Sequence, residues 1–178
     1  MRQRLGSEGW QGRLSEPRVR GDTIIWTSKG DIKGGGLFHI AGGITIYDYA
    51  GDSLETQLTI GMKADSVSAS NGTASFYRWP LELMQFYKSS SFRAGAGLTY
   101  HLNPEAECDL PPSCNDLIKF DNALGYVVQA DYVVPAKQLL RELTIGVRAT
   151  FIDYKVDDGA YYDKIDGNSI GLSLGMSF

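Results

Sequence analysis

The sequence has little of what marks several common classes of protein. None of its 178 residues belongs to a run approaching the roughly 18 consecutive apolar residues of a membrane-spanning helix. A formal net charge of -4, with 21% charged residues, excludes a basic nucleic-acid binder and a strongly acidic disordered chain. We therefore expect no nucleic-acid partner, and the length fits a single domain.

Cysteine and histidine are also scarce, with two of each. Cys108 and Cys114 stand in a short polar segment with Pro111 and Pro112 between them. This spacing favours a disulfide that closes a small exposed loop in an oxidising compartment, with two free thiols as the alternative. No histidine or further cysteine stands near enough to complete a zinc site, so the sequence predicts neither a metal nor a cofactor.

The first 20 residues are polar and rich in arginine, and they lack the apolar stretch of a secretory signal. We expect residues 1–21 to form a disordered polar segment and residues 22–178 to form one β-barrel domain. A removed or replaced signal, a misassigned start and a protein that is not exported all remain open as explanations.

The sequence does contain clear period-two alternation, which predicts two-sided β-strands. In the last strand, small residues (Gly171, Ser173, Gly175 and Ser177) alternate with apolar ones. The apolar positions of this strand are Ile170, Leu172, Leu174, Met176 and Phe178. Similar alternation predicts earlier strands near residues 38–46, 58–63, 76–87, 92–102, 124–132 and 143–151, and a short eighth strand near 22–28. Pro80 predicts a bulge or a gap in its strand, because proline cannot donate a ladder hydrogen bond.

The predicted connections alternate in length. Short ones near 50–53 and 88–91 and a modest one at 135–142 alternate with longer polar ones at 65–75, 103–121 and 155–169. Short turns on one side and long loops on the other are typical of an up-and-down outer-membrane barrel. The segment Ala136–Glu142 is the one stretch with a helical pattern. Aromatic residues near strand ends suggest membrane-interface girdles: Tyr47, Tyr49, Trp79, Tyr87, Tyr100, Tyr132 and Tyr154.

The C-terminal sequence Ile-Gly-Leu-Ser-Leu-Gly-Met-Ser-Phe resembles the β-signal that the barrel-assembly machinery reads. Strands such as Phe-Arg-Ala-Gly-Ala-Gly-Leu-Thr-Tyr are similar to those of small OmpA/OmpX-type outer-membrane barrels, over residues 36–178. The resemblance implies an all-β, antiparallel, up-and-down eight-stranded transmembrane barrel in a bacterial outer membrane. It also implies outer-membrane lipid and the assembly machinery as partners, and we expect a monomer.

The positions between the apolar residues of the strands carry polar and charged side chains. Side chains fill the interior of a narrow eight-stranded barrel, and buried charges must be paired, so we predict an interior polar network. Its predicted members are His39, Lys63, Arg78, Glu82, Arg93, His101, Gln129, Asp131 and Arg148.

An enzyme would need a base within reach of a nucleophile or an activated water. Neither His39 nor His101 has a serine two residues away on its strand, so we expect no catalytic site. The leading hypothesis is a non-enzymatic barrel with a structural role, or with adhesion or binding through its long outer loops. Two alternatives stay open: a narrow pore for small solutes, and a soluble lipocalin-like barrel whose apolar residues point inward.

Overall fold

The computed structural model describes residues 18–29, 35–47, 53–69, 72–110, 114–136, 141–156 and 165–178. None of these residues forms a helix long and apolar enough to cross a membrane. The strands are β1 (Arg18–Lys29), β2 (Gly35–Tyr47), β3 (Leu54–Ala69), β4 (Gly72–Lys88), β5 (Phe92–Leu110), β6 (Cys114–Lys119), β7 (Ala123–Pro135), β8 (Glu142–Phe151), β9 (Asp153–Tyr154), β10 (Ile165–Asp166) and β11 (Ser169–Ser177).

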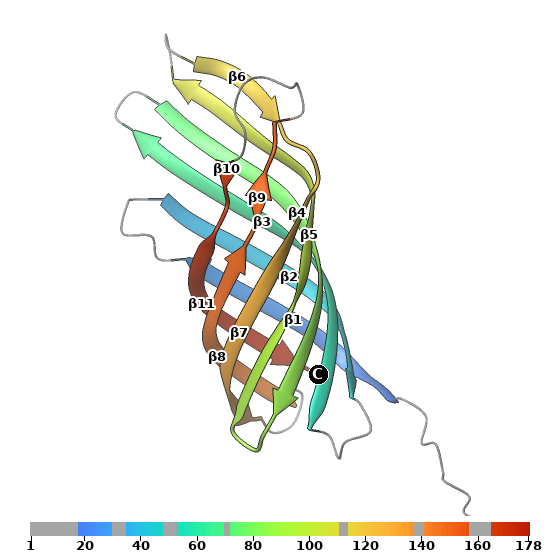
Figure 1. The fold of residues 1–178 in the computed structure, drawn as a ribbon. Coiled ribbons are helices and arrows are strands. Elements are labelled where there is room, and N and C mark those ends of the chain that lie inside the picture. Colours follow the sequence, from blue (N-terminus) through green and yellow to red (C-terminus); the bar gives the residue numbers. More distant parts are fainter. Residues whose placement is uncertain are drawn as a thin grey trace, which may run out of the picture.

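The large sheet is antiparallel and closes on itself (Figure 1). Its strand order is β4-β3-β2-β1-β11-β8-β7-β5-β6, and an additional pairing of β4 with β5 completes the ring. Within the described part of the chain, the ring consists of eight strands, and β6 lies outside it as the hairpin partner of β5. The predicted eight-stranded barrel is therefore confirmed.

Strand β1, for which the sequence predicts only a short strand, lies between β2 and the C-terminal strand β11, and its pairing with β11 joins the first and last strands of the ring. Its residues from Thr23 to Ser28 pair with β11, and the same segment pairs with β2 on the other side. The strand begins at Arg18, four residues before the predicted start of the barrel domain. Residues 1–17 lie outside the described part of the chain, so the disordered segment expected there stays a prediction.

The strand containing Pro80 is irregular at the predicted place. The register between β4 and β5 shifts between Tyr77 and Trp79. The ladder between β3 and β4 also skips the two pairs around Pro80, which has no N–H to donate. On the facing strand, Asn103 has φ 44°, a left-handed conformation that asparagine tolerates better than most residues. Both a bulge and a gap are present, as predicted.

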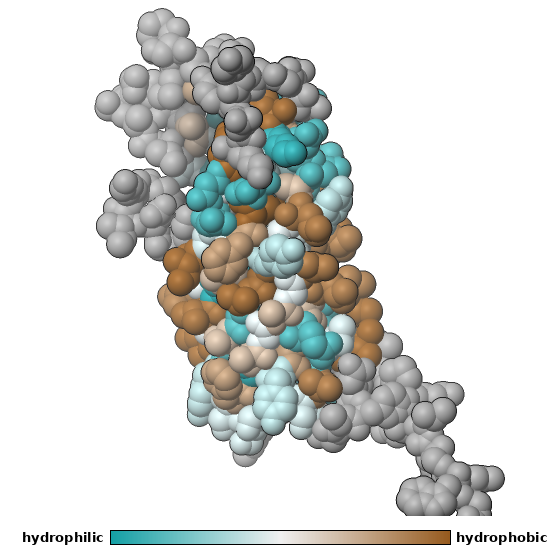
Figure 2. Space-filling model, in the orientation of Figure 1, coloured by the Kyte–Doolittle hydropathy of each residue, from teal (hydrophilic) through white to brown (hydrophobic). Residues whose placement is uncertain are grey.

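The two faces of the barrel wall have opposite polarity. Outward positions are apolar and exposed, as Ile60 (56% exposed) and Leu172 (62%) illustrate, whereas the neighbouring Thr59 and Ser173 are 2% and 1% exposed. Figure 2 shows apolar residues gathering over the middle of the wall on the face that is drawn. A soluble lipocalin-like barrel would have the reverse arrangement, so that alternative is wrong.

Two of the three predicted long loops are largely strand. Residues 65–69 and 72–75 belong to β3 and β4, and most of 103–121 belongs to β5 and β6. These strands continue beyond the closed ring as extended hairpins (Figure 1). The expected helix is also wrong where it can be assessed, because Glu142 lies in β8 and the Ala136 amide donates to the Arg141 carbonyl at 3.0 Å, closing a turn. Residues 137–140 of that segment lie outside the described part.

The polarity of the wall inverts where the strands leave its apolar band. Phe151 is the last outward apolar residue of β8, and beyond it Ile152 and Tyr154 point inward while Asp153 points outward. These inward residues pack with Phe120 and Ala123 in an apolar cluster, against which Phe76 is also packed. Tyr154, expected in an interface girdle, is only 1% exposed and belongs to this interior cluster. That expectation was wrong for Tyr154 because its side chain points into the barrel at this level of the wall.

Candidate functional site: the polar interior of the barrel

All nine residues expected in the interior network lie on the inward face of the barrel, with exposed fractions of 4% or less. They come from strands β2, β3, β4, β5, β7 and β8. Five of them contribute to a set with its members on facing sides of the lumen, and the other four lie nearer the outer end.

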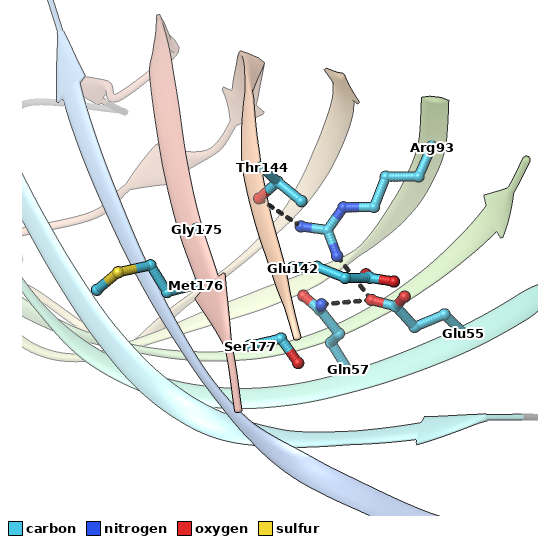
Figure 3. Close-up of a pocket in the computed structure, with 8 residues that line it drawn as sticks. All are labelled: Glu55, Gln57, Arg93, Glu142, Thr144, Gly175, Met176 and Ser177. Atoms are coloured by element: carbon cyan, nitrogen blue, oxygen red, sulfur yellow. Dashed lines mark hydrogen bonds and ion pairs between the residues drawn. The ribbon is translucent and has the colours of Figure 1, made fainter. Parts of the chain in front are cut away.

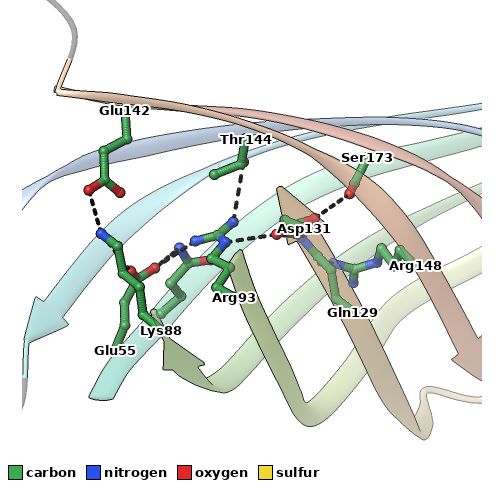
Figure 4. Close-up of polar contacts among 10 residues, drawn as sticks. Glu55, Lys88, Arg93, Gln129, Asp131, Glu142, Thr144, Arg148 and Ser173 are labelled. Atoms are coloured by element: carbon green, nitrogen blue, oxygen red, sulfur yellow. Dashed lines mark hydrogen bonds and ion pairs between the residues drawn. The ribbon is translucent and has the colours of Figure 1, made fainter. Parts of the chain in front are cut away.

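Arg93 on β5 is the centre of the larger set (Figure 4). Its Nε donates to Asp131 Oδ2 at 2.7 Å and its Nη1 donates to Glu55 Oε1 at 2.6 Å. Its guanidinium also lies 4.4 Å from the centre of the Phe86 ring. One cation therefore neutralises two buried carboxylates from opposite parts of the wall, in the geometry that charge-assisted hydrogen bonds favour.

The network continues from Asp131 through Gln129 to Arg148. Gln129 Nε2 donates to Asp131 Oδ2 at 2.8 Å, and Arg148 Nη1 donates to Gln129 Oε1 at 3.0 Å. Arg148 also forms an ion pair with Glu82.

Two hydroxyl groups donate further hydrogen bonds to the carboxylates of this network. Ser173 Oγ donates to Asp131 Oδ1 at 2.8 Å, and Thr99 Oγ1 donates to Glu82 Oε1 at 3.1 Å. Gly146 makes room for this arrangement, because a Cβ atom there would lie 2.3 Å from Asp131 Oδ1.

A group of residues that the sequence analysis missed surrounds the network at the short-turn end of the barrel. Glu55 and Gln57 on β3 are each 1% exposed, and Gln57 Nε2 donates to Glu55 Oε1 at 2.6 Å. Lys88 forms an ion pair with Glu142 and lies 3.9 Å from Glu55 Oε2. Glu55 and Gln57 could be found from the inward phase of β3, which continues from Thr59 by steps of two.

Figure 3 shows Glu55, Gln57, Arg93 and Thr144 directed into one space at this end, whereas Met176 is directed away from it. The space has a volume of only about 10 Å³, close to the minimum that one water molecule requires. The space between these side chains therefore admits about one water molecule.

The outer set consists mainly of basic residues. His39, Lys63 and Arg78 lie directly opposite one another on β2, β3 and β4. Arg78 Nη2 donates to Asp65 Oδ2 at 2.7 Å, and Lys63 Nζ donates to Ser169 Oγ at 3.3 Å. Asp65 thus offsets part of the repulsion that like charges on opposing strands would cause.

His101 connects this set to the apolar cluster above it. The hydroxyl of Tyr154 and His101 Nδ1 are hydrogen-bonded to each other, and burial raises the pKa of Tyr154, which keeps that hydroxyl protonated. The Tyr154 and Phe120 rings each pack edge-on against Phe76, at centroid distances of 5.2 and 5.4 Å. The aromatic rings therefore cover the polar interior at its outer end.

The described interior does not assemble a recognisable catalytic group. The hydrogen-bond partner of His101 is a tyrosine, and His39 Nε2 has no hydrogen-bond partner within the described part of the chain. The described residues also include no group of three or more histidine, cysteine or acidic side chains that could hold a metal ion.

The residues of the expected assembly signal lie on β11 and just after it. Ile170, Leu172 and Leu174 point outward and are exposed, Met176 is half-buried, and Phe178 is 38% exposed. Their recognition by an assembly machinery stays a prediction.

The two cysteines lie in the hairpin formed by β5 and β6. Cys108 is opposite Asp116, and Leu110 is opposite Cys114, so the two cysteines are diagonal neighbours in the ladder. No cysteine among the described residues is free. The pairing of Cys108 with Cys114 stays a prediction.

We expect protein purified without reductant to take up no alkylating reagent at either cysteine, and to take it up at both after reduction. Because the hairpin lies beyond the closed ring, reduction is expected to leave the folded barrel intact on a detergent gel. Mass spectrometry of the alkylated protein tests the pairing, and alkylation of Cys108 or Cys114 before reduction would contradict it.

Closure of the sheet, an apolar exterior and a filled polar interior together define the fold of a small outer-membrane β-barrel. Among solved structures, the chain is similar to the crystal structure of Neisserial surface protein A (NspA). The TM-score is 0.50 and the sequence identity is 16%, over 88% of this chain and 93% of that chain. No family model matches the sequence, and no curated protein matches it.

Proposed function

We propose that this protein is a non-enzymatic barrel of a bacterial outer membrane whose outer hairpins provide a surface for adhesion or binding. The observation that carries the proposal is the inversion of polarity along the wall. Outward residues are apolar across the band of the ring, where the inward face is mainly polar apart from a small cluster of Met84, Phe86 and Val127. Beyond Phe151 the inward residues are the apolar Ile152 and Tyr154, and the outward Asp153 is charged. Such a band is what a bilayer requires on the outside of a barrel, with water on either side of it.

The orientation follows from the connections. The β4–β5 and β7–β8 turns are short and lie at the same end of the barrel as the C-terminus (Figure 1). Short turns face the periplasm in barrels of this class, and the opposite end, with its extended hairpins, faces outward. This orientation exposes β6 and the end of β5 to the exterior, where Leu117 is 56% exposed.

An epitope insertion tests this orientation and the exposure of the hairpin. An epitope placed after Pro112, between β5 and β6, is expected to bind antibody on intact cells. The same epitope placed after Ser90, in the β4–β5 turn, is expected to bind only after the cells are permeabilised. Antibody binding to the Ser90 epitope on intact cells would contradict the proposed orientation, and failure of the Pro112 epitope to bind would contradict the proposed surface.

A narrow pore is the competing function, and the interior argues against it. Side chains of the Arg93 network fill the short-turn end, and the rings of Phe76, Phe120 and Tyr154 cover the outer end. We expect the purified protein to produce no stable conductance steps in a planar lipid bilayer. Stable, voltage-dependent steps from a preparation free of other porins would favour the pore.

A further inference from the structure

The outer surface of the wall contains an apolar groove across β1, β2, β3 and β4. Ile24, Ile40, Ile60, Met62 and Trp79 contribute to its lining, and Gly42 lies at its floor. Its volume of about 420 Å³ falls within the roughly 300–1,000 Å³ typical of small-molecule sites. No polar side chain is among the eight residues that line it.

Gly42 has no side chain, and this leaves a recess within the groove. Gly42 lies on the outward face of β2, opposite Ile24 on one side and Ile60 on the other. A Cβ atom at Gly42 would meet nothing within 4 Å. The next residue differs, because a Cβ atom at Gly43 would lie 2.0 Å from the Leu58 carbonyl oxygen. The fold thus requires glycine at position 43, but packing of the chain does not require it at position 42.

We infer that this groove is a binding site for one acyl chain of a membrane lipid. This inference rests on the proposed function, since the proposed function places this part of the wall in a bilayer. The groove is continuous with the outward apolar surface, on which Leu58, Leu81 and Leu83 are each at least 40% exposed. An acyl chain needs apolar walls and no hydrogen-bond partner, which matches the lining of the groove.

The position of Trp79 indicates which leaflet supplies the chain. Trp79 follows Tyr77 and the extended outer part of β4 in the sequence, so it lies near the outer end of the apolar band, and it is 49% exposed. Tryptophan is enriched at membrane interfaces, so Trp79 marks the outer end of the groove and the level of the lipid headgroups. The acyl chain would therefore enter from the outer leaflet and extend past Met62 toward Gly42.

A second copy of the barrel fits the groove less well. A standard protein interface uses about 20–30 residues on each side, whereas eight residues line this groove. A peptide strand is also unsuitable, because a strand within the apolar band would present unpaired backbone groups to lipid.

Quenching of Trp79 fluorescence tests the inference. The background variant carries Trp10→Phe and Trp26→Phe, which leaves Trp79 as the sole tryptophan. It is reconstituted in phosphatidylglycerol vesicles in which a fraction of the acyl chains is brominated. Gly42→Leu fills the recess, and Gly42→Val fills it in part. Ala96→Leu, at an outward and exposed position of β5, is the matched control.

We expect Gly42→Leu to lower the quenching by about twofold, because a filled recess excludes the chain that packs against one side of the indole. Gly42→Val is expected to have a smaller effect in the same direction, and Ala96→Leu none. Equal quenching in all variants would overturn the inference, since Trp79 would then meet only exchanging boundary lipid. Weak quenching in the background variant together with cross-linked dimers would also overturn it, in favour of a second copy.

Heat-modifiable migration of each reconstituted variant separates this inference from the proposed function. Gly42→Leu is expected to fold, because the open space at Gly42 accepts a side chain and leucine suits a strand better than glycine does. A background variant that never inserts into the vesicles would contradict both proposals. An inserted protein with equal quenching contradicts the acyl-chain site alone.

Discussion

Arg93→Met is expected to destabilise the folded barrel by about 3–5 kcal/mol, because it leaves two buried carboxylates without their shared cation. Asp131 and Glu55 are each 1% exposed and each accept a hydrogen bond from Arg93 at 2.7 Å or less. Gln129 and Ser173 would still donate to Asp131, but neither carries a charge. Urea unfolding in detergent micelles, followed by the shift of the folded band on a gel, measures the loss.

Two controls separate this effect from a general loss of charge. Lys119→Met removes a lysine whose side chain is 62% exposed and lies 3.9 Å from Glu105, a contact worth about 0–1 kcal/mol. Glu55→Gln added to Arg93→Met removes one of the two carboxylates that lose Arg93 and leaves Glu142 as the partner of Lys88, so the double variant is expected to be more stable than Arg93→Met alone. Equal losses from Arg93→Met and Lys119→Met would show that the interior network does not stabilise the barrel.

Leu174→Arg is expected to cost about 2–4 kcal/mol and to impair insertion, because it places a charge in the lipid-facing band. Leu174 on β11 is 45% exposed and pairs with Ile145 of β8, which is 50% exposed. Both side chains therefore face the bilayer in the proposed orientation. The measurement is the yield of heat-modifiable protein after refolding into lipid vesicles, together with its urea midpoint.

Leu117→Arg is the matched control, since it makes the same change at a similarly exposed position (56%) on β6, beyond the apolar band. Its expected cost is within about 0.5 kcal/mol, as for most surface substitutions. A similar loss for both variants would show that residue 174 does not face lipid.

Ser173 is a poorer control than the sequence suggests. From the alternation alone, an arginine at Ser173 would be expected to be better tolerated than one at Leu174, because that face of the strand is polar. The structure changes this expectation, since Ser173 is 1% exposed and donates to Asp131. An arginine there would overpack the interior, which costs about 1–3 kcal/mol or more.

The sequence predicts the part of the fold that lies within the apolar band. There the outside and the inside of the wall differ in polarity, so period-two alternation identifies the face of each residue, as it does for Leu174 and Arg93. The same alternation, together with the likeness to outer-membrane barrels, accounts for the number of ring strands. Pro80 predicts the local irregularity, because it has no N–H to donate to the ladder.

Period-two alternation does not identify the inward and outward faces of a strand where that difference in polarity disappears or reverses. In the segment from Glu55 to Gln57, the outward Thr56 is as polar as its inward neighbours, so no apolar face marks the strand. Beyond Phe151 the apolar residues Ile152 and Tyr154 are the inward ones and Asp153 is the outward one, so the polarity of the two faces is exchanged. The sequence therefore predicts loops where the outer hairpins lie, and a place in the interface girdle for Tyr154.

The pairing of charges depends on side-chain reach across the lumen, which strand periodicity does not contain. Arg93 and Glu55 are 38 residues apart, and Arg148 and Glu82 are 66 apart. Only closure of the ring brings these pairs together. The sequence could therefore predict which residues line the interior, but not that Arg93 and Arg148 are its two main cations.

The most direct test of the central claim, an apolar exterior around a filled polar interior in a lipid-spanning barrel, is heat-modifiable migration. The account predicts that protein refolded into detergent micelles migrates faster on a gel when unheated than after boiling, and that it precipitates when the detergent is removed. Identical migration before and after boiling, with a folded protein that stays soluble without detergent after heating and cooling, would contradict it.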